Sequence, residues 1–174
     1  MRKLLHTISL LLLGLWLGAA VFFSAAVAPN LFAVLRGNEL PNANALAGTI
    51  VTRLLGILNR GGFEISLLLL VISFFATRAQ TRLRRFAEMI SLAIMAIMTG
   101  LGHWVIAARM TALRASMQLP IDQIATTDPR RVQFDSLHRY SVAMMGVAMV
   151  AALIAFVLNA NRTNQSEPPK PSGD

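Results

Sequence analysis

The stretch Leu4–Ala28, LLHTISLLLLGLWLGAAVFFSAAVA, decides the fold class of this chain. It holds 25 residues without a formal charge, and a helix of about 20 apolar residues already crosses a hydrocarbon core about 30 Å thick. The basic start Met1–Lys3 and the small residues Ala26–Ala28 also fit a cleaved signal peptide, but the apolar run exceeds the roughly 7–15 residues of such peptides. We therefore expect a retained transmembrane helix over residues 4–28.

The composition also indicates a membrane protein. Hydrophobic residues make up 55% of the 174 residues and charged residues 14%, compared with roughly 45–50% and 25% in soluble domains. Because the chain has no cysteine and long stretches without charge, it is neither a disulfide-stapled secreted scaffold nor a disordered protein, nor typical of a soluble enzyme. The sequence predicts one membrane domain over residues 1–160 and a disordered polar tail over residues 161–174.

Three further stretches are long and apolar enough to span a membrane. We place these spans at about residues 57–77, 86–108 and 137–159. An amphipathic helix from Ala43 onward precedes the second span or is continuous with it, with a kink or break expected at Gly61–Gly62. The predicted fold is therefore an all-α integral membrane protein, a four-transmembrane-helix bundle.

Local signals place the ends of the helices. Residues 30–41 are rich in turn formers and predict a connection after the first span. Nothing stops the third helix from running on past Arg109. Asp128 followed by Pro129 is typical of a helix N-terminus, so we expect the fourth helix to begin outside the bilayer.

Charged residues indicate how the chain sits in the membrane. Arg60 and Glu64, four residues apart, are expected to neutralise each other near the membrane boundary. The short connection between the second and third spans is the densest in arginine, with Arg78, Arg82, Arg84 and Arg85. By the positive-inside rule, both termini are predicted to be cytoplasmic in a bacterial-type inner (plasma) membrane. No basic face is interleaved with stacking aromatic residues, which argues against nucleic acid as a partner.

Small residues recur every four positions on two spans: Gly14 with Gly18, Ala20 with Ser24 and Ala28, and Ala148 with Ala152. Such stripes let helices approach closely in lipid. We interpret them as packing within the chain, while a homo-oligomer or a membrane partner protein stays open; the lipid bilayer surrounds either arrangement. The nine methionines, including Met95, are interpreted as apolar filler.

One cluster of polar residues suggests a site at the outer ends of the third and fourth spans: His103, Arg109, Arg114, Asp135 and His138. His103 and Arg114 share one face of the third helix, and Asp135 and His138 share a face of the fourth. A hairpin folded near residue 123 puts Arg109 beside Asp135, and an Arg109–Asp135 pair that orders this hairpin is the favoured interpretation. A site in which Arg109 and Arg114 attract an anionic solute is a second interpretation.

A metal or haem site is a third interpretation of the same cluster. Asp135 and His138 have the i, i+3 spacing of two ligands on one metal, and His103 and His138 are possible ligands for copper or haem. The hairpin separates the levels of His103 and His138 by about five residues, or about 7–8 Å of helical rise, which is long for shared ligation. No nucleophile triad, phosphate loop or paired-carboxylate site is found, so we expect no enzymatic activity and commit to no cofactor.

Four short motifs keep their order along most of the chain, from about Gly18 to Ser141. They are Phe22-Phe23 followed by Ala28-Pro29-x-Leu31-Phe32-x-x-Leu35, then Ala47-Gly48 with Arg53, then Arg109-Met110-x-x-Leu113-Arg114, and then Phe134-x-x-Leu137-His138-x-x-Ser141. In these motifs the chain resembles the transmembrane protein 205-like family, which is also catalogued as a domain of unknown function. The resemblance implies a four-helix integral membrane protein without an established biochemical activity.

The resemblance extends, more distantly, to copper-resistance D-like membrane proteins and a haem-using membrane oxidase. Likeness at this distance concerns the fold and confers no function. Our leading hypothesis is a non-enzymatic inner-membrane protein that binds or moves a small solute or serves as a membrane partner. The hairpin between the third and fourth helices would be its working end.

Overall fold

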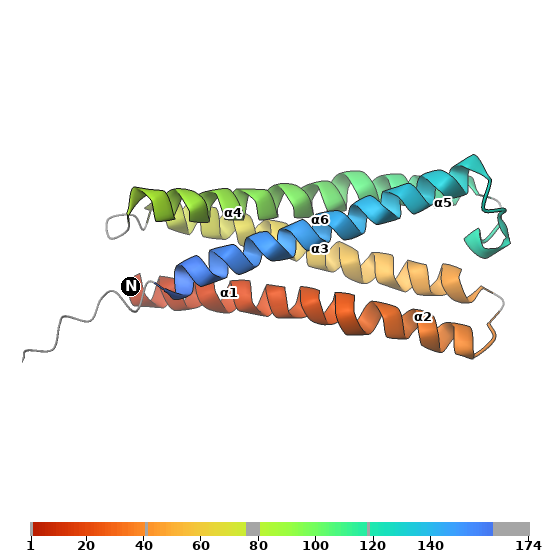
Figure 1. Ribbon diagram of the computed structural model, residues 1–174, viewed down its shortest axis with the longest axis horizontal. Helices are drawn as coiled ribbons and strands as arrows, with labels where there is room; N and C mark the ends of the chain where they lie inside the picture. Colours follow the sequence, from red (N-terminus) through yellow and green to blue (C-terminus); the bar gives the residue numbers. More distant parts are fainter. Residues whose placement is uncertain (1, 41, 76–80, 118, 162–174) are drawn as a thin grey trace, which may run out of the picture.

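The computed structural model describes residues 2–40, 42–75, 81–117 and 119–161, and every regular element among them is helical (Figure 1). In chain order these elements are α1 (Arg2–Phe22), η1 (Phe23–Val27), α2 (Ala28–Gly37), α3 (Ala43–Phe75), α4 (Arg82–Gly100), η2 (Leu101–Ala107), α5 (Ala108–Ser116), η3 (Ile121–Gln123) and α6 (Pro129–Ala160). Elements that follow without a gap make four long helices: α1–η1–α2, α3, α4–η2–α5 and α6. All four are long and apolar enough to cross a membrane, which confirms the predicted fold class.

The predicted disordered tail falls almost wholly on residues 162–174, which lie outside the described residues. The same holds for Arg78 and for the last two residues of the span predicted at 57–77.

The four long helices lie side by side and alternate in direction (Figure 1). The start of α1, the end of α3, the start of α4 and the end of α6 share one end of the molecule, called the terminal end below. The other end, called the hairpin end, holds the α2–α3 and α5–α6 connections. α6 packs against α1 and α4, and α3 packs against α1, α2 and α4, so the helices enclose a common interior.

Two apolar clusters fill this interior. The larger contains Leu13, Trp16, Ala20, Leu69, Leu92, Met95, Met145, Ala148, Ala151, Ala152 and Ala155. The smaller lies toward the hairpin end and contains Ile106, Met110, Phe134 and Leu137. Met95 and Met145 thus act as the predicted filler, and the fully buried Ala148 and Ala152 pack helices within the chain. Gly18, in contrast, has open space where a Cβ would stand, whereas a Cβ on Gly14 would lie 3.5 Å from the Phe156 ring of α6, so only Gly14 of this stripe meets another helix.

The first long helix runs further than predicted. The sequence predicts a turn-rich connection from residue 30, but helical structure continues through Gly37. Pro29 lacks a backbone N–H, and its ring clashes with the preceding turn of a regular helix. The π-helical turn η1 directly before it widens the backbone at that point, and the Asn30 side chain donates from Nδ2 to the Ala26 carbonyl at 2.8 Å. The proline is therefore absorbed inside one continuous helix.

The predicted break at Gly61–Gly62 is absent, because α3 runs through it as a single helix of 33 residues. Gly62 instead lets α1 approach: the indole Nε1 of Trp16 donates to the Leu58 carbonyl at 2.9 Å, and the ring lies over Gly62. A Cβ on Gly62 would stand 2.7–2.8 Å from three atoms of that ring, whereas a Cβ on Gly61 would meet nothing within 4 Å. Close packing of the Trp16 ring therefore requires a glycine at position 62.

The other predicted helix ends are confirmed. The third long helix continues past Arg109 to Ser116, and α6 begins at Pro129. Asp128 caps α6, because its carboxylate accepts a hydrogen bond from the Arg130 backbone N–H at 2.8 Å.

Candidate functional site

The structure separates the five residues predicted to form one site. Arg114 points inward and is half-buried, and so is His103, whereas Arg109, Asp135 and His138 are exposed. The inward positions on this part of α6 are occupied by Phe134 and Leu137, which pack on Ile106 and Met110. Since Asp135 and His138 each follow an inward residue by one position, their side chains turn away from the interior.

The predicted Arg109–Asp135 ion pair does not form. The described residues contain two ion pairs, Arg60–Glu64 and Arg130–Asp128, and neither involves the predicted pair. The interpretation that Arg109 and Asp135 order the hairpin is therefore wrong, because both side chains lie on outward faces of their helices.

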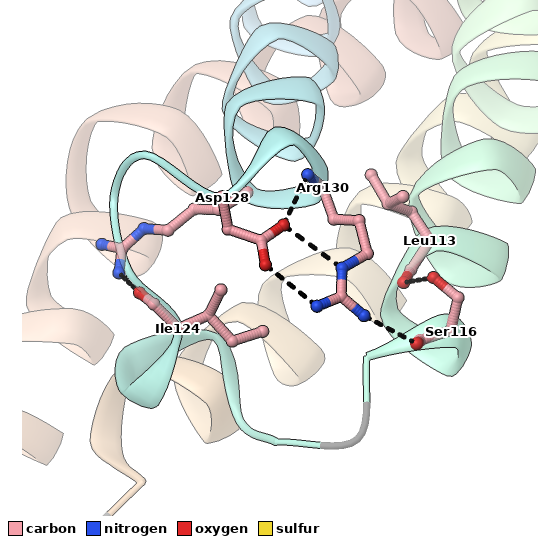
Figure 2. A network of polar contacts seen from close by, with 6 residues as sticks. Leu113, Ser116, Ile124, Asp128 and Arg130 are labelled. Atoms are coloured by element: carbon pink, nitrogen blue, oxygen red, sulfur yellow. Dashed lines mark hydrogen bonds and ion pairs between the residues drawn. The ribbon is translucent and has the colours of Figure 1, made fainter.

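Two other arginines order the α5–α6 hairpin (Figure 2). The Arg130 guanidinium donates to both carboxylate oxygens of Asp128, at 3.2 and 2.9 Å, and to the Ser116 carbonyl at the end of α5, at 3.3 Å. Arg131 donates to the Ile121 and Ile124 carbonyls of the connecting loop. The hydrogen bonds from Arg130 hold the pKa of Asp128 below its ordinary value. The hairpin is thus closed by charge-assisted bonds to backbone carbonyls.

We expect the Asp128 cap to survive mild acid. Because the folded pKa of Asp128 lies below the unfolded value of about 3.9, the cap contributes stability above about pH 4 and loses it as the pH falls through the lowered pKa. Hydrogen exchange in the first turn of α6, followed against pH and corrected for intrinsic rates, should show this step. Asp128→Ala should exchange several-fold faster at neutral pH and show no step. Loss of wild-type protection well above pH 4 would contradict this assignment.

Arg114 connects three long helices at the hairpin end. Its guanidinium donates from Nη1 to Thr52 Oγ1 of α3 at 3.4 Å, and its Cζ lies 4.9 Å from the centroid of the Phe134 ring of α6. The Arg114 Nη2 atom lies against the α3 backbone at Gly48, because a Cβ added to Gly48 would stand 2.7 Å from this nitrogen. We call Gly48, Thr52, Arg114 and Phe134 the Arg114 site. Within the described residues, no carboxylate lies within ion-pair distance of Arg114.

The Arg114 site joins residues from three of the sequence motifs. Arg114 itself was predicted, whereas Gly48 and Phe134 were noted only as members of motifs and Thr52 was missed. The signal that could have revealed them is spacing: Gly48 and Thr52 are four residues apart and so lie on one helix face. Gly48 carries no side chain, which leaves room for a guanidinium.

His103 lies deeper in the interior. The Nδ1 atom of His103 is buried and has no hydrogen-bond partner among the described residues. This atom lies close to Gly56, because a Cβ on Gly56 would stand 3.9 Å from it. The His103 ring meets the Trp104 ring edge-on. His138 is exposed on α6, so the two histidines do not face a common point. Among the described residues, no group of three or more His, Cys, Asp and Glu side chains is placed to hold a metal ion.

A second polar cluster lies at the terminal end. The Glu88 side chain is 1% exposed, and its Oε1 accepts hydrogen bonds from Ser73 Oγ at 2.7 Å and from Asn159 Nδ2 at 3.0 Å. These contacts join α3, α4 and α6. Nearby, Arg84 donates to the Leu158 carbonyl and Arg85 to the Phe74 carbonyl. Two arginines of the predicted positive-inside cluster therefore also satisfy the last carbonyls of α6 and α3.

The chain matches the family described as Domain of unknown function (DUF4149) over residues 11–118. The match covers α3, α4 and α5, which carry Gly48, Thr52, Glu88 and Arg114, and ends before α6. No curated protein and no solved structure shows significant similarity to the chain. Because the matched region makes up more than half of its residues, the chain belongs to the DUF4149 family of domains of unknown function.

Proposed function

We propose that this protein is a non-enzymatic, multi-pass protein of a bacterial-type inner membrane that binds an anionic group at the Arg114 site. Four apolar helices and membership of the DUF4149 family support the membrane part of the proposal. The resemblance of its motifs to the transmembrane protein 205-like family agrees with a four-span protein and supplies no activity. The proposed binding needs no cofactor.

The observation that carries the proposal is the unpaired charge of Arg114. A guanidinium half-buried among three helices loses part of its hydration, and such charges are normally compensated by a partner of opposite sign. Thr52 and the Phe134 ring compensate it only partly, since a hydroxyl and an aromatic face carry no net charge. An anion that approaches from the hairpin end would supply the missing partner.

The chemistry of Arg114 indicates the class of ligand. A guanidinium offers a planar fork of N–H donors that matches phosphate and carboxylate oxygens. Arg109 lies slightly more than one turn before Arg114 on α5 and is exposed. Its charge adds positive potential at the hairpin end. Arg114 follows the end of the span 86–108 by six residues, or about 9 Å, which places it at the outer edge of the headgroup layer, about 5–8 Å thick on each side. A phosphate group, on a lipid or in a small solute, fits this position.

The proposed orientation puts this site outside the cytoplasm. The arginines Arg82, Arg84 and Arg85 lie at the terminal end, and the positive-inside rule assigns that end to the cytoplasm. With both termini cytoplasmic, the Arg114 site faces the outer leaflet and the space beyond it.

Arg114→Gln is expected to weaken phosphate binding about 10- to 100-fold, because a hydrogen bond to a charged group contributes about 1.5–3 kcal/mol. Thermal midpoints of the detergent-purified protein would be measured during titration with inorganic phosphate. They would be compared with midpoints in nanodiscs of zwitterionic lipid and of lipid containing phosphatidylglycerol. Arg114→Lys should retain part of the effect, since it keeps the charge and loses the fork.

The matched control is Arg36→Gln, which removes an exposed arginine at the same end. The Arg36→Gln variant should bind phosphate as tightly as the wild type does. A response to free phosphate alone indicates a solute, and a response to anionic nanodiscs alone indicates a lipid headgroup. Equal binding by wild type and Arg114→Gln would overturn the proposal.

A further inference from the structure

Arg60 and Glu64 form the ion pair predicted from their spacing, with 2.9 Å between Nε and Oε1, yet they face outward. Their side chains are 68% and 59% exposed. The inward positions around them are taken by Asn59 and Ser66, which are 4% and 0% exposed. The pair therefore lies on the outer surface of α3.

The depth of this pair follows from the packing of α3 against the third long helix. Phe63, next to Glu64, packs on Gly100, because a Cβ there would stand 3.2 Å from the Phe63 ring. Gly100 precedes Arg109 by nine residues, about 14 Å, and follows Arg85 by fifteen residues, about 22 Å. If those arginines mark the two membrane surfaces, Glu64 lies well inside the hydrocarbon layer and not near its boundary, where the sequence pattern places it.

An ion pair that faces lipid at this depth is unusual. Ionisable residues inside membranes generally face protein or a water-filled cavity. The intrahelical bond satisfies one guanidinium N–H, and lipid chains offer no acceptor for the others. The remaining donors of Arg60 and the second carboxylate oxygen of Glu64 call for polar partners on whatever covers this face.

The surface around the pair is otherwise apolar and continuous. On the same side of α3 it consists of Ile57, Leu67, Leu68 and Val71, which are between 43% and 69% exposed. We call these four residues together with Arg60 and Glu64 the outer α3 stripe. A partner for it must be apolar along most of its length and must carry one basic and one acidic group in the middle.

We propose that the outer α3 stripe binds the same stripe of a second copy of this chain. A two-fold axis along the membrane normal sets Arg60 level with Arg60 and Glu64 level with Glu64 of the other copy. Each Arg60 can then reach the other copy's Glu64 diagonally, across four residues or about 6 Å along the parallel helices. An extended arginine side chain spans that offset. The two intrahelical pairs become a closed four-charge cluster buried between the copies.

Charge reversal with mixing tests this dimer. Arg60→Glu would leave the dimer with only acidic side chains in the cluster, and Glu64→Arg would leave it with only basic ones, so each variant alone should be monomeric. A mixture of the two restores both reciprocal contacts, because one chain then carries two acids and the other two bases. Subunit counting by single-molecule photobleaching in lipid bilayers, with the two variants labelled in different colours, should show mixed dimers.

Two further variants make the result decisive. The double variant Arg60→Glu/Glu64→Arg keeps every contact with reversed sign and should dimerise like the wild type. Arg139→Glu, which reverses an exposed charge on α6 and not on α3, should leave the dimer unchanged. A monomeric wild type, dimers of either single variant alone, or a mixture that stays monomeric would each overturn the proposal.

Discussion

Gly62→Ala should destabilise the helical domain by about 2 kcal/mol, although alanine is the better helix former. The added methyl group would enter the Trp16 ring at 2.7–2.8 Å. Overpacking of this kind costs about 1–3 kcal/mol, and a displaced Trp16 also loses its hydrogen bond to the Leu58 carbonyl, worth about 1 kcal/mol. The gain of about 1 kcal/mol from replacing glycine in a helix offsets only part of this.

Gly61→Ala supplies the matched control, one residue away on the same helix. Nothing lies within 4 Å of a Cβ at Gly61, so only the gain in helix propensity remains. We expect its thermal midpoint in mild detergent to equal or exceed that of the wild type, while Gly62→Ala unfolds at a lower temperature. Equal midpoints for the two variants would mean that Trp16 does not rest on Gly62 as described.

The number and position of the long helices could be predicted from the sequence because they depend on local composition. A run of 25 uncharged residues such as Leu4–Ala28 has no alternative fold that buries as much apolar surface. The start of α6 was predictable for the same reason, since Asp128 and Pro129 act within one turn. Nothing distant along the chain was needed for either inference.

The extension of the first long helix could not be predicted in this way. Turn formers around Asn30 and Gly37 outweigh helix formers in the local pattern. In the fold, α2 packs against α3, and η1 accommodates Pro29, so tertiary contacts decide the outcome. The break predicted at Gly61–Gly62 was wrong for a related reason, because the requirement for Gly62 comes from Trp16 on another helix.

The candidate site was predicted in part. Arg114 faces the interior, but Asp135 and His138, assigned to the same site, do not, since Phe134 and Leu137 occupy the inward positions of α6. The third long helix contains a π-helical turn, η2, with a wider repeat, yet His103 and Arg114 are both half-buried on the interior side, as their predicted shared face requires. Periodicity at 3.6 residues cannot foresee such a turn.

The sequence pattern places Glu88 at the start of a span and gives no sign of its burial, because a lone acid beside an apolar stretch commonly marks its end. Its partners are far away in sequence: Ser73 on α3 and Asn159 on α6. No local pattern connects three residues on three helices. The contact emerges only when the terminal end is assembled.

Glu88→Ala is expected to lower the unfolding free energy by about 3 kcal/mol. The change removes the acceptor of the Ser73 hydroxyl in a site 1% exposed, and a buried unsatisfied group costs about 1–3 kcal/mol. The Asn159 amide loses one hydrogen bond, worth about 1 kcal/mol, and keeps its bond to the Ala155 carbonyl at 3.1 Å. Glu88→Gln retains an acceptor oxygen in nearly the same place and should lose only about 1 kcal/mol. Thermal or denaturant unfolding in detergent, compared across the two variants, measures the difference.

The double variant Glu88→Leu/Asn159→Leu separates this explanation from a simple loss of volume. The Ser73 hydroxyl loses its acceptor in the double variant and in Glu88→Ala alike. Replacing the Asn159 donor and the Glu88 acceptor together by apolar groups is often nearly neutral, so the double variant should be more stable than Glu88→Ala despite carrying two changes. If the double variant is instead as unstable as the sum of the single variants, the hydrogen bonds to Glu88 do not join α4 to α6. The stability of the terminal end would then come from the apolar packing of Leu69, Leu92 and Ala155 beside it.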